Sequence, residues 1–457
     1  MKIPYPFQVI GRDFLANRTE ALLADDMGLG KTLQAIEAIK ARGLTKGIIV
    51  CPHAVRRQWV KNIREQYPTA FVKELTKKES VVEPNAINVI NYDIVWRPPI
   101  KTNLKNIQWE FIICDEAHFL KAWDSNRTIA CLGKQGLYRS CTRRWMLTGT
   151  PVLNRPVELY PMLRALAPYL LGEYTDYYKF AKRFCGAFMD HRNNLDVSGA
   201  TNLAELAVLV RPFFLRRLKT DVLSELPPII YEKIYTDRTD KIIQAYKHLE
   251  QEIGDVASLR RAVGIIKTKQ TIEHITDVLT TKEKVLVFAY HKDVVDAIVA
   301  AFPGSVQYTG GENAKQKEEA IRRFISDNSC RVFVGNIKAA GFGIDGLQEV
   351  CDHCIFAEIS YVPGELNQAV DRIYRIGQTK PVTVQFIVAE DSMEEDIINS
   401  VTSKSKNIKT ILQEGGEIRF VGVECAYCQE RVELKDATRV AQITVCKKCK
   451  REMECLL

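Results

Sequence analysis

The sequence predicts an α/β protein built from two similar blocks, with a small cysteine-bearing module after them. Three observations support this class. Short apolar runs alternate with helical patterns over residues 21–149, the alternation returns over residues 284–389, and two C-x-x-C pairs follow residue 415. Alternating strands and helices favour mostly parallel sheets covered on both faces. A chain of 457 residues exceeds what one hydrophobic core usually serves, so several domains are expected.

The composition is that of a globular protein, with 46% hydrophobic and 26% charged residues. The longest apolar runs are too short to cross a bilayer, and the N-terminal "MKIPYPFQ" has no signal-peptide core. We therefore expect an intracellular chain that uses no membrane. In a reducing compartment, the thirteen cysteines indicate buried thiols plus a metal site rather than disulfides. A net charge of +8 is compatible with a nucleic-acid partner without establishing one.

The first block contains five short buried runs, each followed by a turn or a helical stretch. The predicted strands are "ALLA" at 21–24, "GIIVC" at 47–51, "INVINY" at 87–92, "FIICDE" at 111–116 and "RRWMLTG" at 143–149. From about residue 157 to residue 209 leucine, tyrosine and alanine recur at helical intervals, which indicates a helical insertion.

The second block begins with helical patterns at 240–253 and 256–280 and continues with four further predicted strands. These are "KVLVFAY" at 284–290, "RVFVGN" at 331–336, "HCIFAE" at 353–358 and "VTVQFIVA" at 382–389. The stretch "RRLKTDVLSELPP" ends in two prolines and is the best hinge candidate. We predict a first lobe at 1–215 with its insertion at 157–209, a linker at 216–238, a second lobe with an N-terminal helical insertion and a C-terminal helix at 239–415, and a zinc-binding module at 416–457.

A phosphate-binding loop is predicted in "ADDMGLGKT", between a short apolar run and a helical pattern. Gly28 and Gly30 let backbone N–H groups converge on an anion at a helix N-terminus. Lys31 would reach the outer phosphates, and the Thr32 hydroxyl could ligate Mg²⁺. Asp25 stands where the general pattern has a glycine, so a plain glycine-rich turn followed by a surface lysine is the alternative. The predicted loop comprises Asp26, Met27, Gly28, Leu29, Gly30, Lys31 and Thr32.

An acid pair follows the apolar run of "FIICDEAH", which places Asp115 and Glu116 at the carboxyl end of a strand. One acid can hold magnesium, and its neighbour can polarise the attacking water. An acidic first turn of a helix is the bland alternative. Together with the lysine loop, the pair predicts a nucleoside-triphosphatase site that binds ATP.

Several motifs together resemble the Swi/Snf family of helicase-related ATPases, which belongs to helicase superfamily two. They occur in the family's order and span almost all of residues 5–400. The resemblance implies two RecA-like lobes that bind ATP and Mg²⁺. Within the family, the sequence is most similar to the annealing-helicase branch, whose members act on branched DNA. The motifs are "ADDMGLGKT", "DEAH", "LTGTP" at 147–151, "LRRLKTDVLSELPP" at 215–228, "AAGFGID" at 339–345 and "QAVDRIYRIGQ" at 368–378.

The resemblance also implies roles for single residues on the first lobe. Gln8 in "PYPFQ" resembles the glutamine that reads adenine. Lys31 and Thr32 would hold phosphate and magnesium, while Asp115 and Glu116 would handle magnesium and water.

On the second lobe, Arg372 and Arg375 resemble arginine fingers, with Gln368 beside them, and Asp345 is expected to line the cleft. The two arginines are three residues apart, so on a helix they would share a face. A solvated basic stripe is the alternative for such a pair. Fingers on one lobe and a phosphate loop on the other would make hydrolysis depend on domain closure.

The resemblance implies a partner of double-stranded or branched DNA, along which the chain would move through phosphate contacts. Candidate contacts are Lys121 and Arg127 after the acid pair, and Arg56, Arg57 and Trp59 in "PHAVRRQW". An ordinary basic surface loop is the alternative for each of them.

The function predicted from these motifs is a DNA-dependent ATPase that couples hydrolysis to movement along duplex DNA and remodels protein–DNA complexes or branched DNA. A strand-separating DNA or RNA helicase is the alternative enzyme. The third class is a binding protein that is gated by ATP but does not hydrolyse it. Such a protein would lack a catalytic acid or an arginine finger, and this sequence retains all of them. We expect a monomer that works with DNA, in a bacterial cytoplasm or nucleoid, an infected host cell or a nucleus.

The last part of the chain predicts a structural zinc site, because two C-x-x-C pairs are separated by seventeen residues. Strand-like pieces between the pairs suggest the hairpins of a zinc-ribbon-like module, and a redox centre or loose thiol pairs are the alternative. The basic tip at residues 447–451 is a candidate contact for DNA or a protein partner. The predicted zinc ligands are Cys425, Cys428, Cys446 and Cys449.

"CDHC" at 351–354 also has metal-ligand spacing, with His353 inside it. No second cysteine pair lies near it in the sequence, and it leads into a predicted core strand. Buried free thiols are therefore the preferred interpretation.

Overall fold

The computed structural model describes residues 3–223, 225–236, 256–340, 344–390 and 392–412, and four short strands after them. The chain divides into two compact units, which are described separately. Unit 1 comprises Met1–Leu226, Val362–Asp371 and Ser403–Gly415. Unit 2 comprises Pro227–Tyr361, Arg372–Thr402 and Gly416–Leu457.

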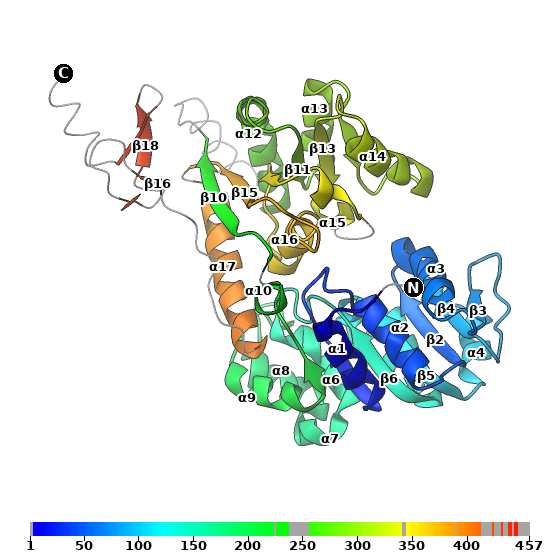
Figure 1. Cartoon of the computed structure of the whole chain (residues 1–457). Helices are drawn as coiled ribbons and strands as arrows, with labels where there is room; N and C mark the ends of the chain where they lie inside the picture. Colours follow the sequence, from blue (N-terminus) through cyan, green and yellow to red (C-terminus); the bar gives the residue numbers. More distant parts are fainter. Residues whose placement is uncertain are drawn as a thin grey trace. The chain divides into compact units, whose positions relative to one another are not determined.

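Unit 1 is built on a seven-stranded sheet of order β3-β4-β2-β5-β6-β1-β9, in which every neighbouring pair is parallel (Figure 1). Successive residues of a strand point to opposite faces, and both faces of this sheet are covered. Ile48 and Val50 of β2 pack into one core and Ile49 into the other. The strands are β1 (Glu20–Leu23), β2 (Gly47–Cys51), β3 (Val72–Glu74), β4 (Ile87–Asn91), β5 (Trp109–Asp115), β6 (Cys141–Leu147) and β9 (Phe214–Leu215).

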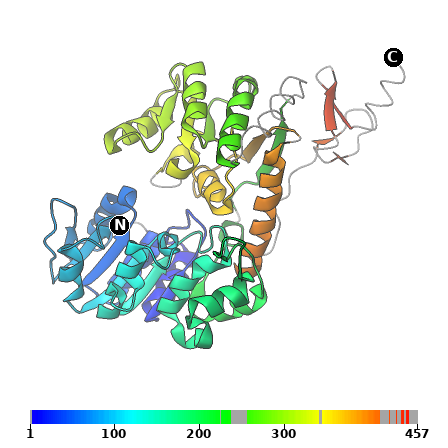
Figure 2. The same cartoon turned by 180° about the vertical axis from the view of Figure 1, so that it is seen from behind.

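Different helices cover the two faces of this sheet. Apolar residues of α1 (Pro6–Ala16), α2 (Lys31–Ala41) and α3 (Arg56–Gln66) form one core with it. The other face receives α4 (Ile100–Lys105), α5 (Asn126–Leu132) and the helices of residues 157–209, which Figure 2 shows grouped together in cyan to green. Those last helices are α6 (Tyr160–Leu166), α7 (Pro168–Leu171), α8 (Tyr177–Cys185) and α9 (Leu203–Val210), with a small hairpin of β7 (Phe188–Met189) and β8 (Leu195–Asp196).

Three further helices, all after β9 in the sequence, contribute to unit 1. Helix α10 (Lys219–Val222) follows β9 directly. Helix α16 (Pro363–Val370) packs closely on unit 1, since the amide of Gly364 donates to the carbonyl of Leu153 at 3.2 Å. The end of α17 (Met393–Leu412) adds Ile411 and Leu412 to the unit 1 core. The sequence patterns did not anticipate these last two additions.

Unit 2 has a six-stranded parallel sheet of order β10-β15-β14-β11-β13-β12. Its strands are β10 (Ile229–Tyr235), β11 (Val285–Ala289), β12 (Val306–Tyr308), β13 (Val332–Asn336), β14 (His353–Phe356) and β15 (Val382–Val388). Its helices are α12 (Val256–Val278), α13 (Lys292–Ala301), α14 (Ala314–Ser326), α15 (Ile337–Ala340) and the first part of α17.

The predicted α/β class with two parallel-sheet lobes is confirmed, and each of the nine predicted strands is present. Four strands of the two sheets were not predicted. β3, β9 and β12 have only two or three residues, and "IIYEKIY" of β10 is half-buried along its whole length at a sheet edge. Such strands lack the continuous apolar run that marks a central parallel strand. The helical pattern at 240–253 lies outside the described residues.

Near the C-terminus, β16 (Val423–Glu424) pairs antiparallel with β17 (Arg431–Val432), and β18 (Ala437–Val440) with β19 (Ile443–Cys446). Of the predicted zinc ligands only Cys446 lies in a described strand, and Cys425, Cys428 and Cys449 lie outside the described residues.

The thiols of "CDHC" agree with the preferred interpretation of that motif. Cys351 and Cys354 are free and buried. Burial raises the pKa of Cys351 to about 12 and that of Cys354 well above its ordinary value. The Nε2–H of His353 donates to Gln385 Oε1 at 2.9 Å, and burial lowers the pKa of this imidazole. Among the described helices, none is long and apolar enough to span a bilayer.

Candidate functional site

The predicted phosphate loop connects β1 to α2 and has the backbone that the glycines require. Gly28 and Gly30 adopt φ angles of 87° and 75°, which residues with a Cβ rarely adopt. The predicted adenine-reading glutamine lies against this loop, because Gln8 Nε2 donates to the carbonyl of Leu29 at 3.1 Å. A Cβ at Gly30 would stand 2.3 Å from that Nε2. Glycine is therefore favoured at residue 30 by its conformation, and a side chain there would also displace the amide of Gln8.

Lys31 is buried at the start of α2, where its ammonium donates to the carbonyls of Asp25 at 2.7 Å and Asp26 at 3.2 Å. Burial lowers its pKa, and the carboxylates of Glu116, Asp25, Asp115 and Asp26 oppose that shift. The fold therefore brings the loop lysine into the field of the acid pair.

The acid pair stands at the carboxyl end of β5. Asp115 accepts the indole N–H of Trp59 at Oδ2, 2.6 Å away, and the amide of Glu116 at Oδ1, 3.0 Å away. Burial, followed by the charge of Glu116, raises the pKa of Asp115 to about 7, and the hydrogen bond from Trp59 and the positive charge of Lys31 limit the rise. Glu116 has a positive φ of 49°, and such non-glycine outliers cluster at functional sites.

A row of polar side chains extends from the acid pair to α16. His118 Nδ1 lies 3.3 Å from Glu116 Oε2 and 3.1 Å from the hydroxyl of Thr148. The same nitrogen lies 3.4 Å from the hydroxyl of Thr150, which accepts the amide of Gln368 at 3.0 Å. Gln368, which the resemblance places beside the arginine fingers as part of the nucleotide site, is buried in unit 1 and joined to the acid pair through "LTGTP".

Asp25, which replaces the usual glycine of the loop, is fully buried and paired with Arg217. The guanidinium donates to Asp25 through Nε at 2.9 Å and also through a terminal nitrogen. It donates further to Gln34 Oε1 at 3.0 Å and to the carbonyl of Phe7. The departure from the general loop pattern thus has a structural reason, since the aspartate anchors an arginine of "LRRLKTD".

The neighbouring residues of "LRRLKTD" contact two more motifs of the site. Arg216 donates to Asp26 Oδ1 at 3.0 Å and to the carbonyl of Gly149 at 3.0 Å. The amide of Lys219 donates to Asp26 Oδ2 at 3.1 Å, and its ammonium pairs with Asp371. The start of the predicted linker therefore holds the phosphate loop and "LTGTP" within unit 1.

The predicted arginine fingers belong to unit 2. Arg372 donates to the carbonyl of Ile344 at 3.1 Å, and Arg375 pairs with Asp345 Oδ1 at 3.0 Å. The helix on which the two arginines would share a face does not reach them, because α16 ends at Val370 and turns follow it. The turns still direct both guanidinium groups to the carbonyl of Ile344, which lies 3.5 Å from Arg375.

Two predicted DNA contacts are contradicted by their burial. Trp59 is 1% exposed and donates its indole N–H to Asp115. Arg56 is 8% exposed and forms an ion pair with Glu74 at 2.8 Å. The face of α3 that carries Arg56 and Trp59 packs into the core. Of the three predicted contacts on this helix, only Arg57 is exposed.

The other predicted residues of this region have less distinctive surroundings. Lys121 is exposed, with its ammonium 3.4 Å from Glu158, and Arg127 is half-buried. Met27 is buried in the loop, and Thr32 is half-buried as the second residue of α2.

Sequence reasoning missed Trp59, Arg217 and His118 as parts of the site. Trp59 lies 56 positions from Asp115 in the sequence, and Arg217 lies 192 positions from Asp25. The motifs of the resemblance did include "LRRLKTD", which contains Arg217, and "DEAH", which contains His118, whereas Trp59 lies in none of them.

Comparison with known families agrees with this site. The model of the SNF2-related domain matches residues 10–290, and that of the helicase conserved C-terminal domain matches residues 267–377. The first match covers more than half of the chain. The chain therefore belongs to the SNF2-related family, and it is an enzyme of this ATP-hydrolysing class.

Two curated relatives show the degree of similarity. The "DNA annealing helicase and endonuclease ZRANB3" of Homo sapiens is 29% identical over 85% of this chain and 38% of its own length. The "SWI/SNF-related matrix-associated actin-dependent regulator of chromatin subfamily A-like protein 1" of Xenopus laevis is 32% identical over 88% of this chain and 43% of its own length. The chain thus spans about two fifths of the length of these relatives.

Among solved structures, the "Sulfolobus solfataricus SWI2/SNF2 ATPase core in complex with dsDNA" matches with a TM-score of 0.44 and 23% identity. The match covers 91% of this chain and 98% of that chain.

Proposed function

We infer that this protein is a DNA-stimulated ATPase that moves along double-stranded DNA and remodels branched DNA or protein–DNA complexes. Family membership supports the ATPase chemistry. The names of both curated relatives refer to DNA or chromatin, and the name of the human relative refers to DNA annealing. We propose that the protein acts as a monomer, in a compartment that contains DNA.

One observation supports the proposed chemistry most strongly: the buried ammonium of Lys31 lies in the field of Asp115 and Glu116. A cation at a helix N-terminus beside two carboxylates is the arrangement that phosphoryl transfer from a nucleotide needs. We propose that Lys31 and the loop amides bind the phosphates of ATP. Gln8 would bind adenine, and Glu116 would orient the attacking water.

The donor set of the site fits Mg²⁺. Asp115 is a buried carboxylate whose raised pKa reflects incomplete compensation of its charge, and a divalent cation would supply that compensation. Carboxylate and hydroxyl oxygens are the ligands that Mg²⁺ prefers. We propose that Asp115 and Thr32 hold the ion, which when bound would neutralise charge on the phosphates.

We propose further that Arg372 and Arg375 complete the reaction centre when hydrolysis occurs. Their contacts with Ile344 and Asp345 support a fixed presentation of both guanidinium groups. Asp345 would act on the nucleotide through Arg375, and Gln368 through Thr150.

The discriminating experiment measures ATP turnover with linear duplex DNA, forked duplex DNA, single-stranded DNA and RNA. We expect duplex DNA to stimulate turnover, forked duplex to stimulate it at least as strongly, and RNA to have no effect. Stimulation by RNA or single strands alone would overturn the proposal in favour of a strand-separating helicase. Glu116→Gln is the control, since it should retain ATP binding without turnover.

We also propose that Cys425, Cys428, Cys446 and Cys449 hold one structural zinc ion. Four thiolates in two C-x-x-C pairs suit a closed tetrahedral site. The antiparallel pairs β16–β17 and β18–β19 support a ribbon, because Glu424 directly precedes the first cysteine and Cys446 ends β19. The module would add a contact to DNA or to a protein partner through its basic tip.

A further inference from the structure

Helix α16 packs against the rest of unit 1 along one side. At its start, the amide of Gly364 donates to a carbonyl just after "LTGTP" at 3.2 Å. In its middle, Gln368 donates to a threonine hydroxyl of "LTGTP" at 3.0 Å. At its end, the carboxylate of Asp371 pairs with the ammonium of Lys219. Gly364, Gln368 and Asp371 are spaced four and three positions apart, so these contacts lie on one side of the helix.

The contact at the end of α16 is connected to the phosphate loop. Lys219 is 3% exposed, and its amide donates to Asp26 Oδ2 at 3.1 Å while its ammonium pairs with Asp371. Arg216, three residues earlier, donates to Oδ1 of the same aspartate at 3.0 Å. The carboxylate of Asp26 is thus bound at both oxygens by the segment that carries Lys219. Through Lys219, this segment joins the phosphate loop to α16.

Asp371 directly precedes the first proposed arginine finger, Arg372. The division into units falls between these two residues. Because consecutive Cα atoms are about 3.8 Å apart, an ion pair that fixes Asp371 also restrains the backbone of Arg372. The side chain of Arg372 is buried and donates to the carbonyl of Ile344 at 3.1 Å. Lys219 is therefore placed to act on hydrolysis through the finger that follows its partner in the chain.

We propose that Lys219 is a positioning residue for ATP hydrolysis, whose ion pair with Asp371 sets the backbone of Arg372 with respect to the phosphate loop. This inference rests on the proposed function, because an arginine finger acts only on a nucleotide that is being hydrolysed. The attraction between two charges falls as they separate, and it is strongest where water is excluded. A largely buried pair therefore restrains this backbone more than an exposed pair would. The competing role is structural, because removal of one partner of a buried pair also destabilises the fold.

The first test is Lys219→Met, which removes the ammonium and retains an unbranched side chain. We expect kcat with saturating duplex DNA to fall about tenfold to a hundredfold, since small misplacements of catalytic groups have effects of this size. KM and the affinity for ATP should change by less than about twofold, because no proposed phosphate-binding group is removed. Lys219→Arg retains the charge and should recover most of the loss. A wild-type kcat in Lys219→Met overturns the inference.

The second test asks whether the lysine acts through the finger, in which case its replacement should matter only while Arg372 is present. Single-turnover hydrolysis is measured for Lys219→Met, Arg372→Ala and the double variant, so that slow rates can be compared. We expect the double variant to hydrolyse ATP as slowly as Arg372→Ala alone, within about twofold. Losses that multiply in the double variant would show that the lysine acts by another route, and they would overturn the inference.

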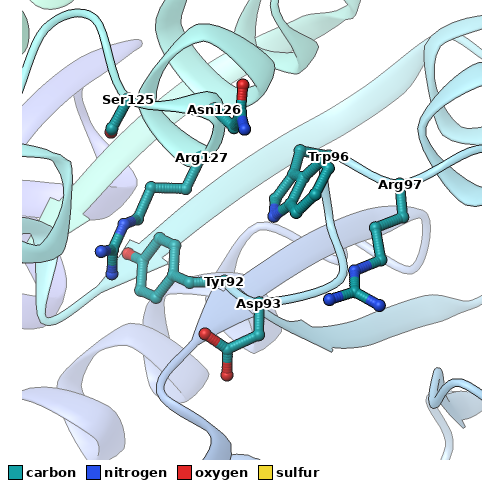
Figure 3. A pocket seen from close by; sticks show the side chains of 7 residues that line it. All are labelled: Tyr92, Asp93, Trp96, Arg97, Ser125, Asn126 and Arg127. Carbon is teal, nitrogen blue, oxygen red and sulfur yellow. The ribbon is translucent and has the colours of Figure 1, made fainter.

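Tyr92→Phe is the control for this comparison. Figure 3 shows Tyr92 beside a hollow of unit 1, and its hydroxyl donates to the carbonyl of Asp115 at 2.8 Å. This variant therefore alters the surroundings of the acid pair through a different hydrogen bond. It should change hydrolysis by the same factor with and without Arg372→Ala. If its effect also disappeared in that background, the comparison would not single out Lys219, and the inference would be wrong.

Melting temperatures separate positioning from stability. The matched control is Lys284→Met, since Lys284 is also a buried lysine, and its ammonium donates to the carbonyl of Asp327 at 2.8 Å in unit 2. A structural role predicts that both variants lose kcat in proportion to their fall in melting temperature, and that result would overturn the inference. Where Lys219→Met does not fold, Asp371→Asn removes the same ion pair from its more exposed side and should show the same loss of kcat. A wild-type kcat in Asp371→Asn overturns the inference in that case.

The outcomes also distinguish this inference from the proposed function. A wild type without DNA-stimulated turnover, or Arg372→Ala with normal hydrolysis, counts against the proposed function. Impaired hydrolysis in Arg372→Ala beside normal hydrolysis in Lys219→Met counts against this inference alone.

Discussion

The indole N–H of Trp59 donates to Oδ2 of Asp115 across 2.6 Å, from a helix on one face of the unit 1 sheet to the carboxyl end of its central strand β5. A short hydrogen bond to a charged group is among the stronger ones in proteins. The tryptophan therefore orients the carboxylate that we propose holds magnesium.

Replacement of Trp59 with phenylalanine should lower kcat for ATP about tenfold or more. The ring would still fill the core, but the carboxylate would lose a hydrogen bond worth roughly 1.5–3 kcal/mol. Steady-state turnover at saturating ATP and DNA measures this effect. Trp145→Phe is the matched control, because that buried indole donates to the carbonyl of Arg18, away from the acids. Equal turnover in the two variants would contradict the positioning role.

The stability of the metal-free protein should depend on pH through Asp115. Burial raises its pKa from 3.8 to about 7 in the folded chain. Between these values the folded state binds more protons than the unfolded state, so the free energy of unfolding falls as pH rises through the window. Melting temperatures in EDTA at about pH 5 and pH 7.5 measure this slope. Asp115→Asn should be less sensitive to pH, and an unchanged dependence in that variant would refute the assignment.

Arg217→Ala should destabilise unit 1 strongly, because it leaves the fully buried carboxylate of Asp25 without its cation. Loss of one partner of a buried pair costs roughly 3–5 kcal/mol. Chemical denaturation of the variant measures the change, and Asp25→Ala/Arg217→Ala should recover part of it. The control is Arg183→Ala, which breaks an exposed pair with Glu205 and should change the stability little, because solvent screens exposed pairs. A loss of similar size in both single variants would argue against the anchoring role of Asp25.

Arg375→Ala should retain ATP binding but nearly abolish hydrolysis. An arginine finger contributes roughly 10³–10⁵ in rate. Nucleotide affinity and DNA-stimulated turnover are measured together, so that a folding defect would appear in both. Arg322→Ala, on the exposed side of α14, is the control from the same unit. Near-normal turnover of Arg375→Ala would exclude a finger role.

Metal analysis of the purified chain should find about one zinc per molecule, as four thiolate ligands predict. Cys428→Ser should remove most of it, whereas Cys351→Ser should not, because Cys351 is a buried core thiol. Retention of zinc in Cys428→Ser would rule out the proposed ligand set.

Local sequence patterns were sufficient to predict most strands of both sheets. A buried parallel strand is a contiguous apolar run, so residues 47–51 and 111–116 were recognisable from their composition alone. Edge strands such as β10 were missed, because their residues are only half-buried and their apolar signal is interrupted. The turns after Val370 also escaped prediction, since a spacing of three residues describes helices and some turns equally well.

The amino-acid order alone was enough to place the phosphate loop, the acid pair and the two α/β blocks, because each of these is encoded by neighbouring residues. The partners of those residues followed from the packing of the folded chain. Asp115 meets Trp59, and Asp25 meets Arg217, because parallel strands bring their carboxyl ends to one edge of the sheet. Contacts between residues so far apart in the sequence follow no periodic pattern. Which side chains pair can therefore be seen only in the folded structure.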